Sequence, residues 1–203
     1  MSTLLPLFPL DVVLLPGTPL PLHIFEPRYR EMIAECLEQK ISFGVVRAKE
    51  EGLAEIGCTA KIVTVTKNYG DGRMDIVTEG QRRFEIMELD HERSFLRADV
   101  LYLDDDPAPA AAGEIAQAVE LHGELMSLSG IASSGAPDLE PHHISFQLAG
   151  SLPLDSDFKQ TLLGMKSEAE RIPAVVSYFG ALLPGLRRVV STRQRAGGNG
   201  HVH

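Results

Sequence analysis

The sequence predicts a mixed, mainly β fold, in which a partly closed β-barrel with one early helix precedes a helical subdomain. Short apolar and β-branched runs follow one another as far as residue 103. A single amphipathic helical pattern interrupts them after residue 26, and helical patterns dominate beyond residue 113. Six or more short strands with one helix among them are typical of a sheet that closes on itself.

The first strands are expected in a proline-rich apolar stretch, residues 4–32. Apolar runs separated by turn residues predict three strands there, at Leu4–Phe8, Val12–Leu15 and Leu20–Phe25. Prolines at positions 19 and 21 each remove a backbone donor. The third strand is therefore expected at an edge of the sheet or at a bulge.

A helix is expected to begin at Pro27, because proline suits the first turn, where its missing N–H is not needed. Apolar residues then recur at helical spacing and form one stripe, made of Tyr29, Met32, Ile33, Cys36 and Leu37. This pattern predicts an amphipathic helix that docks on the sheet. On that stripe Cys36 is expected to be a buried small hydrophobe.

The remaining barrel strands follow the same logic. Apolar and β-branched runs predict strands at Ile41–Val46, Ile56–Asn68, Met74–Val77, Arg82–Leu89 and Phe95–Leu103. The Asp71-Gly72 pair is typical of a hairpin turn. The charged segment 47–55 is expected to be a solvent loop.

The composition changes after residue 103 and suggests four segments. Residues 1–103 form the barrel, the acidic and proline-rich residues 104–113 form a linker, and residues 114–184 form the helical subdomain. Asp155 is a plausible N-cap, because its carboxylate can accept backbone N–H bonds of the following turn. Residues 185–203 are expected to be a basic, flexible tail.

Charge and composition narrow the classes of function. The net charge of −9 over 203 residues disfavours a broad electrostatic grip on nucleic acid. Two cysteines, Cys36 and Cys58, form neither a disulfide framework nor a zinc spacing. No signal peptide and no apolar run long enough to span a bilayer is visible, so we expect a cytoplasmic protein without a membrane partner.

No catalytic site, cofactor or metal site is predicted. The sequence has no phosphate-binding loop and no G-x-S-x-G nucleophile motif. Ser133 and Ser134 have no visible activating base, and the adjacent His142 and His143 cannot readily share a metal on a helix. The acidic run 104–106 is more simply a solvated linker than a cation site.

His23 and Glu26 flank the junction between the third strand and the helix. Neither lies beside a candidate nucleophile, so His23 is expected to make a structural hydrogen bond rather than to act in acid–base chemistry. Glu26 is expected to form a partly buried ion pair that attaches the helix to the sheet. Three arginines are candidate partners for it: Arg28, Arg82 and Arg83.

Several sequence runs resemble one known family in their order and separation. They are LPLFPLDVVLLPGTPLPLHIFEPRYREM from Leu5, FGVV from Phe43, GCTAKI from Gly57, DGRMDIVTEGQRRFEI from Asp71 and LAGSLPLDSDFKQTLL from Leu148. Together they resemble the N-terminal substrate-binding domain of Lon protease, from Leu4 to about Phe179. Each run alone is weak, whereas their common order is specific.

The resemblance implies a PUA-like β pseudo-barrel with a helical C-terminal subdomain that recognises unfolded or tagged polypeptides. In the full protease this domain precedes an ATPase and a Ser-Lys peptidase, and neither is present in this sequence. We therefore expect a stand-alone, non-enzymatic peptide-binding module. An adaptor role in protein quality control, with a separate protease as partner, fits this resemblance.

An edge strand with exposed apolar residues could hold an extended peptide, through backbone bonds and shallow pockets for alternate side chains. Six residues are candidates for that surface: Pro21, His23, Phe25, Tyr29, Tyr69 and Arg73. For each of them, core packing or turn formation is the simpler alternative. An edge strand also leaves open a homodimer.

Two other classes of function stay open. The PUA-like fold and the arginines between positions 187 and 195 suggest RNA binding, which the net charge of −9 disfavours. An independent hydrolase would need a site that the sequence does not show.

Overall fold

Two compact units make up the computed structural model. The first comprises Met1–Asp105 and Pro153–Met165, and the second comprises Asp106–Leu152 and Lys166–His203. The structure describes residues 4–130 and 143–198, with side chains as far as residue 192. The sequence assigns residues 153–165 to the helical subdomain, whereas the structure groups them with the strands.

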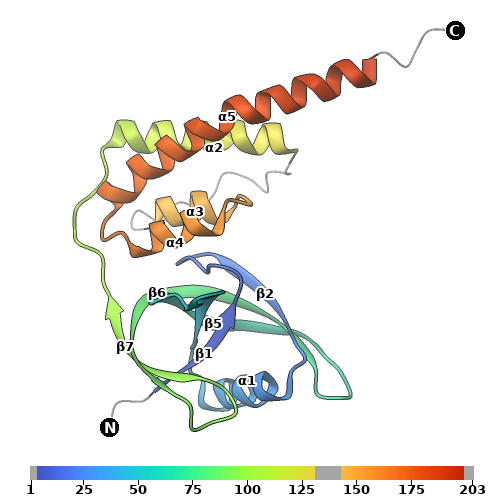
Figure 1. Ribbon diagram of the computed structural model, residues 1–203, viewed down its shortest axis with the longest axis vertical. Coiled ribbons are helices and arrows are strands. Elements are labelled where there is room, and N and C mark those ends of the chain that lie inside the picture. Colours follow the sequence, from blue (N-terminus) through green and yellow to red (C-terminus); the bar gives the residue numbers. More distant parts are fainter. Residues whose placement is uncertain (1–3, 131–142, 199–203) are drawn as a thin grey trace, which may run out of the picture. The chain divides into compact units, whose positions relative to one another are not determined.

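The strands of the first unit close into a ring (Figure 1). In sequence order they are β1 (Leu5–Leu10), β2 (Pro19–Ile24), β3 (Phe43–Lys49), β4 (Gly52–Leu53), β5 (Ile56–Asn68), β6 (Met74–Asp90) and β7 (Arg97–Leu103). Their order in the sheet is β1-β7-β6-β5-β3-β4, and β1 also pairs in parallel with β3. This last pairing closes the ring, and it confirms the predicted pseudo-barrel.

The predicted strand at Val12–Leu15 is wrong. These residues lie in an irregular connection between β1 and β2, and Leu14 and Leu15 are buried there. The Leu15 carbonyl accepts hydrogen bonds from the backbone N–H and the hydroxyl of Thr18. This connection passes so close to β6 that a Cβ on Gly80 would lie 2.2 Å from the Leu15 oxygen. Apolar burial without strand pairing explains the error.

Strand β6 is one continuous strand of 17 residues, where the sequence predicts two. Its first half pairs with β2 on one side and β5 on the other, and its second half pairs with β5 and β7. The stretch between the two predicted strands includes Thr78 and Gly80, which are both buried. These residues continue the β6 ladder rather than form a turn.

Helix α1 (Pro27–Gln39) is confirmed, with proline in its first turn. The predicted stripe is buried at four positions, Tyr29, Met32, Ile33 and Cys36, while Leu37 is 40% exposed. Lys40 caps the end of the helix, because its left-handed backbone (φ 53°) lets its N–H bond to the Cys36 carbonyl.

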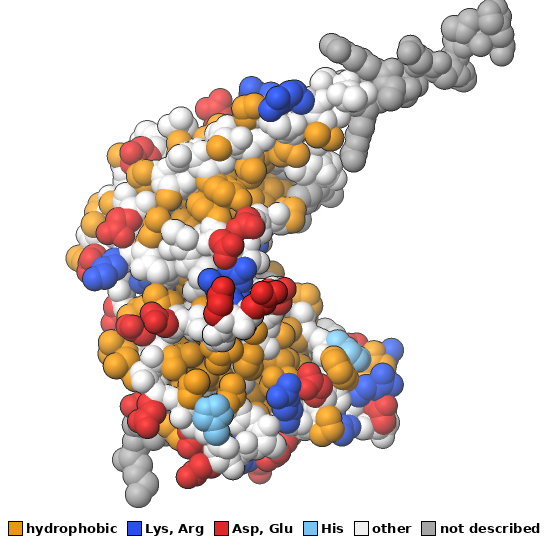
Figure 2. All heavy atoms as spheres, in the orientation of Figure 1, with side chains coloured by type: hydrophobic (Ala, Val, Ile, Leu, Met, Phe, Trp, Pro, Cys, Tyr) orange, Lys and Arg blue, Asp and Glu red, His pale blue; other side chains and the backbone are white. Residues whose placement is uncertain are grey.

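Helix α4 (Ser156–Gly164) belongs to the barrel unit. Asp155 caps it as predicted, because its carboxylate accepts the backbone N–H groups of Asp157 and Phe158. Gln160 donates to the Ile56 carbonyl of β5, so α4 is attached to the sheet. Figure 2 shows hydrophobic side chains gathered on the face of this unit that is turned to the viewer, with charged side chains around them.

The second unit contains α2 (Ala112–Ser129), α3 (Ile144–Gly150) and α5 (Glu168–Gly198). The fully buried Arg171 joins α5 to α3, because its guanidinium donates to the Ser145 hydroxyl and to the Glu168 carboxylate. No helix among residues 4–130 and 143–198 is both long and apolar enough to cross a membrane.

The boundary predicted between the helical subdomain and the tail, after residue 184, does not end a helix. Pro184 lies inside α5, which continues to Gly198, so the expected flexible tail is helical as far as that residue. Arg187 forms an ion pair with Glu124 of α2, with 2.6 Å between nitrogen and oxygen. Residues 199–203 lie outside the described part of the sequence.

Candidate functional site

Alternate residues of β2 point out of the barrel. Pro21 and His23 are exposed, Ile24 is buried, and Phe25, just after the strand, is 58% exposed. Successive side chains of a strand point to opposite faces, which places Pro21, His23 and Phe25 on the same outer face. Half-buried Leu20 and Leu22 anchor the strand from the other side.

A carboxylate on the neighbouring strand holds two of the predicted site residues. The register of β2 against β6 places Asp75 opposite His23, and the His23 Nδ1 lies 2.5 Å from the Asp75 Oδ1. The Tyr69 hydroxyl donates to the Asp75 Oδ2 at 2.8 Å. These hydrogen bonds, first from His23 and then from Tyr69, hold the pKa of Asp75 below its usual value.

Three rings meet around this carboxylate. The His23 ring stacks on Phe25, with 5.9 Å between ring centroids and 21° between planes. The edge of Tyr69 meets His23 at 5.7 Å. Lys67 and Arg73 place their cationic groups 4.6 and 5.1 Å from the Tyr69 centroid. We call this set the His23 surface: Pro21, His23, Phe25, Lys67, Tyr69, Arg73 and Asp75.

The hairpin between β5 and β6 fixes the position of Tyr69 and Arg73. Tyr69 donates its N–H to the Arg73 carbonyl, and Gly72, with φ 85°, donates to the Tyr69 carbonyl. The Arg73 side chain donates to the Asp71 carboxylate at 2.8 Å. Arg30 of α1 donates to the Asp71 carbonyl. The hairpin tip is therefore tied to the helix, and the surface is preorganised.

The outer edge of β2 presents mainly acceptors. Gly80 donates its N–H to the Thr18 carbonyl, so the even-numbered residues of β2 turn their backbone groups toward β6. The outward backbone groups belong to Pro19, Pro21 and His23. Within the described residues no second strand pairs with β2. Because proline lacks an N–H, this edge offers three carbonyls and a single donor, at His23.

Tyr29, the sixth predicted site residue, lies away from the His23 surface. Its side chain is buried, and its ring packs against Phe8 with 4.1 Å between centroids. Burial raises the pKa of its phenol. Its place on the apolar stripe of α1 already indicates this core position. Conversely, Lys67 and Asp75 belong to the surface although the sequence does not single them out.

The ion pairs differ from those expected across the sheet. Glu26 pairs with Arg28 at 2.9 Å, and both side chains are exposed. Arg82 pairs with Asp104, and Arg83 pairs with Asp105. Of the three expected partners of Glu26, Arg28 is the one in the structure, but the pair is neither buried nor a link between helix and sheet.

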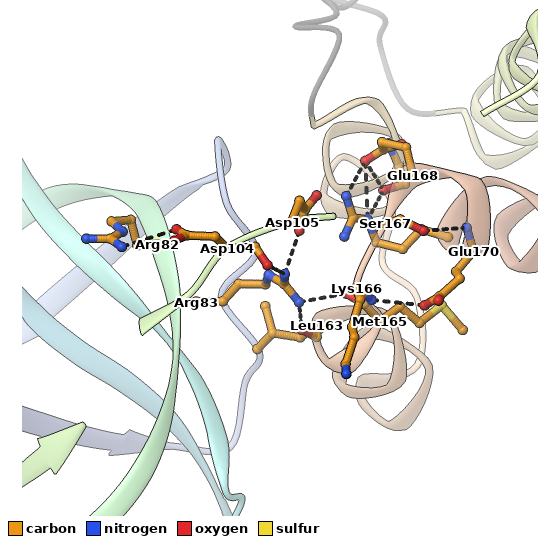
Figure 3. Close-up of polar contacts among 12 residues, drawn as sticks. Arg82, Arg83, Asp104, Asp105, Leu163, Met165, Lys166, Ser167, Glu168 and Glu170 are labelled. Atoms are coloured by element: carbon orange, nitrogen blue, oxygen red, sulfur yellow. Dashed lines mark hydrogen bonds and ion pairs between the residues drawn. The ribbon is translucent and has the colours of Figure 1, made fainter. Parts of the chain in front are cut away.

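Arg83 is a buried cation of the barrel unit (Figure 3). Its side chain is 4% exposed, and it donates to the carbonyls of Leu163 and Met165 and to the Asp105 carboxylate. It therefore attaches the end of α4 and the segment after β7 to β6. The acidic run that the sequence assigns to a solvated linker thus supplies a structural partner.

The described residues contain no group of three or more His, Cys, Asp or Glu side chains that could hold a metal ion. Both thiols are buried, and burial raises the pKa of Cys36 and of Cys58 to about 12. Ser133, Ser134 and His142 lie outside the described residues.

The fold is that of solved Lon N-terminal domains. The crystal structure of a Lon N-terminal domain protein from Xanthomonas campestris aligns with 87% of this chain and 99% of its own, at a TM-score of 0.69 and 24% identity. The N-terminal domain of Lon protease from the Mycobacterium avium complex aligns with 88% of this chain and 98% of its own, at a TM-score of 0.65 and 18% identity. At these identities the likeness shows the fold alone.

The sequence places the chain in a family. The ATP-dependent protease La (LON) substrate-binding domain matches residues 4–179, and the chain belongs to this family. A Lon protease from Parabacteroides distasonis is 34% identical over 110 residues, which are 50% of this chain and 13% of that protein. Lon protease 1 from Hydrogenovibrio crunogenus is 23% identical over 181 residues, 82% of this chain and 22% of that protein. The chain thus spans at most about a fifth of these relatives.

Proposed function

We propose that this protein binds unfolded or extended polypeptides at the His23 surface. The observation that carries the proposal is an exposed group of rings on a preorganised support: Phe25 is 58% exposed, and His23 and Tyr69 are fixed by one carboxylate. Rigid aromatic side chains bind with little loss of conformational entropy, so they suit contacts with many different apolar side chains. Membership of a substrate-binding family supports the same function.

The outer edge of β2 favours partners whose backbone N–H groups are free. Its outward carbonyls can accept N–H groups from an extended peptide, while the aromatic rings contact the peptide's side chains. Two copies of β2 would face each other with carbonyls and prolines, and most of these carbonyls would find no donor. The edge therefore favours a client with free N–H groups over a homodimer formed by β2 pairing.

An adaptor role is the finer part of the proposal. A surface that holds a client reversibly can present it to a separate protease, and the matched relatives carry the name Lon protease. The contacts that the His23 surface can make with a client are those of exposed charges and aromatic rings, and each contributes about 1 kcal/mol or less. A few such contacts favour weak, reversible binding. Weak binding suits a module that passes its client on.

Fluorescence anisotropy with a labelled unfolded casein fragment tests the binding surface. Phe25→Ser and Tyr69→Ser are expected to weaken binding about five- to tenfold each, because each removes a ring contact worth about 1 kcal/mol. Met87→Ser is the matched control, since Met87 is 61% exposed and lies outside the His23 surface. Equal losses for Met87→Ser and Phe25→Ser, or no binding by the wild type at high micromolar concentration, would overturn the proposal.

A further inference from the structure

A pocket of about 350 Å³ lies beside the C-terminal end of α1. Cys36, Leu37, Ile41 and Ile62 supply an apolar lining, and Lys40 and Lys61 line the same pocket. Small-molecule sites are concave and mostly apolar, with a few polar groups that fix the ligand, and their volumes begin at about 300 Å³. The pocket therefore has the size and lining for one small group.

The charged residues that line the pocket have one sign. No lining residue carries a carboxylate, although the whole protein has a net charge of −9. Among the described residues neither Lys40 nor Lys61 forms an ion pair; the cross-strand neighbour of Lys61 is Glu79, whose carboxylate accepts from Gln81. Two ammonium groups without a carboxylate partner, next to apolar side chains, favour an anion with an apolar portion.

The local fold gives a structural reason for a lysine at position 40 but not for a lysine at position 61. Lys40 is the C-cap of α1, and the partial negative charge of the last carbonyls favours a cation at this position. Lys61 lies on β5 and has no such role. The helix end also repels an anion by itself. Attraction to the two lysine ammonium groups is therefore what allows a carboxylate to bind in this pocket.

We propose that this pocket binds an aliphatic carboxylate, with its carboxylate between Lys40 and Lys61 and its aliphatic group against Leu37, Ile41 and Ile62. The occupant that combines these groups within a polypeptide is a free C-terminus that ends in an aliphatic residue. A free short-chain aliphatic acid has the same chemistry. The inference does not rest on the His23 surface, which consists of other residues.

An NMR titration of the full-length ¹⁵N-labelled protein at low salt distinguishes these sources. The probes are N-acetyl-leucine, its amide N-acetyl-leucinamide, and isovalerate. N-acetyl-leucine is expected to shift the amides of residues 36–42 and 61–62, and the neutral amide is expected to bind at least about tenfold more weakly. Tighter binding of N-acetyl-leucine than of isovalerate identifies a polypeptide C-terminus, and the reverse order identifies a free acid. Equal binding of acid and amide, or no shift with either acid at about 10 mM, overturns the proposal.

Substitution of one lysine tests the charge directly. Lys61→Met is expected to weaken N-acetyl-leucine binding about fivefold, since an exposed charge pair contributes up to about 1 kcal/mol, and to leave amide binding unchanged. Lys166→Met is the matched control, because it removes an exposed lysine that does not line the pocket. The same affinity for the wild type and Lys61→Met, or the same loss in the control, would contradict the proposed site. Binding at this pocket is measured without any casein fragment, so its failure is separate from failure at the His23 surface.

Discussion

The Nδ1 of His23 lies 2.5 Å from the Oδ1 of Asp75, on the strand that pairs with β2. The other oxygen of the same carboxylate accepts the Tyr69 hydroxyl at 2.8 Å. One side chain thus fixes the two rings that stand beside the exposed Phe25. Their orientation depends on a residue that contributes no ring to the His23 surface.

We predict that Asp75→Asn weakens polypeptide binding at the His23 surface. The Asp75 carboxylate accepts from both His23 and Tyr69, whereas an amide has one oxygen and one NH2 group. One of the two rings would therefore face a donor, and it must change its tautomer or turn its hydroxyl to keep a hydrogen bond, which loosens the fixed orientation of the pair. Freeing a side chain that must be ordered again on binding costs about 0.5–1.5 kcal/mol, or about two- to tenfold in affinity. Anisotropy with the labelled casein fragment measures the loss, and Asp99→Asn on the neighbouring strand β7 serves as the control.

The same pair predicts a pH dependence of stability. The pKa of Asp75 is lowered in the folded protein, first by His23 and then by Tyr69, so its stabilising effect is present above its unfolded pKa. The effect is lost as the pH falls through the folded pKa, which lies below 3.8. The unfolding midpoint of the wild type should therefore exceed that of Asp75→Asn at pH 6, and the difference should shrink below pH 3.8. A constant difference across this range would contradict the assignment.

The candidate surface could be predicted only in part from the sequence. Alternation along β2 places Pro21, His23 and Phe25 on one face, and this follows from the two-residue period alone. Asp75 could not be found in the same way. It lies 52 residues after His23 in the sequence, and the two residues meet only through the register of β2 against β6. Tyr29 belongs to the core, as its place on the stripe of α1 indicates.

The fold errors have a similar cause. Leu14 and Leu15 are as apolar as strand residues, but they are buried by packing under a close backbone crossing rather than by strand pairing. Proline at position 184 predicts a helix end, yet contacts such as that between Arg187 and Glu124 continue beyond it. In both places tertiary packing decides between conformations that local sequence leaves close in energy.

Gly80→Ala is expected to destabilise the barrel unit. A Cβ at this position would lie 2.2 Å from the Leu15 carbonyl oxygen, which is backbone and cannot rotate away. Shifts forced by overpacking typically cost about 1–3 kcal/mol. Gly70→Ala is the control, because a Cβ there meets nothing within 4 Å. Urea denaturation measures both variants. Equal midpoints would show that the Leu15 carbonyl does not lie as close to Gly80 as the structure places it.

The two thiols are expected to resist modification in the folded protein. Cys36 and Cys58 are 1% and 0% exposed, and burial raises both pKa values to about 12. Because the thiolate is the reacting form, only a very small fraction of either thiol is reactive at pH 8. A chromogenic disulfide reagent should therefore detect almost no thiol natively and two per molecule in denaturant. Rapid native labelling of Cys36 would show that its thiol is more accessible than its 1% exposure indicates.

Adjacent arginines on β6 allow a sharp test of burial. Arg83→Met should destabilise the protein by about 3 kcal/mol, because it removes a buried cation and leaves the Asp105 carboxylate and the carbonyls of Leu163 and Met165 without its N–H groups. Arg82→Met should cost less than about 1 kcal/mol, since its pair with Asp104 is exposed on both sides. Both changes remove one positive charge, so a difference between them reports burial rather than net charge. Urea denaturation monitored by circular dichroism gives both values, and equal losses would mean that Arg83 does not attach α4 to the sheet.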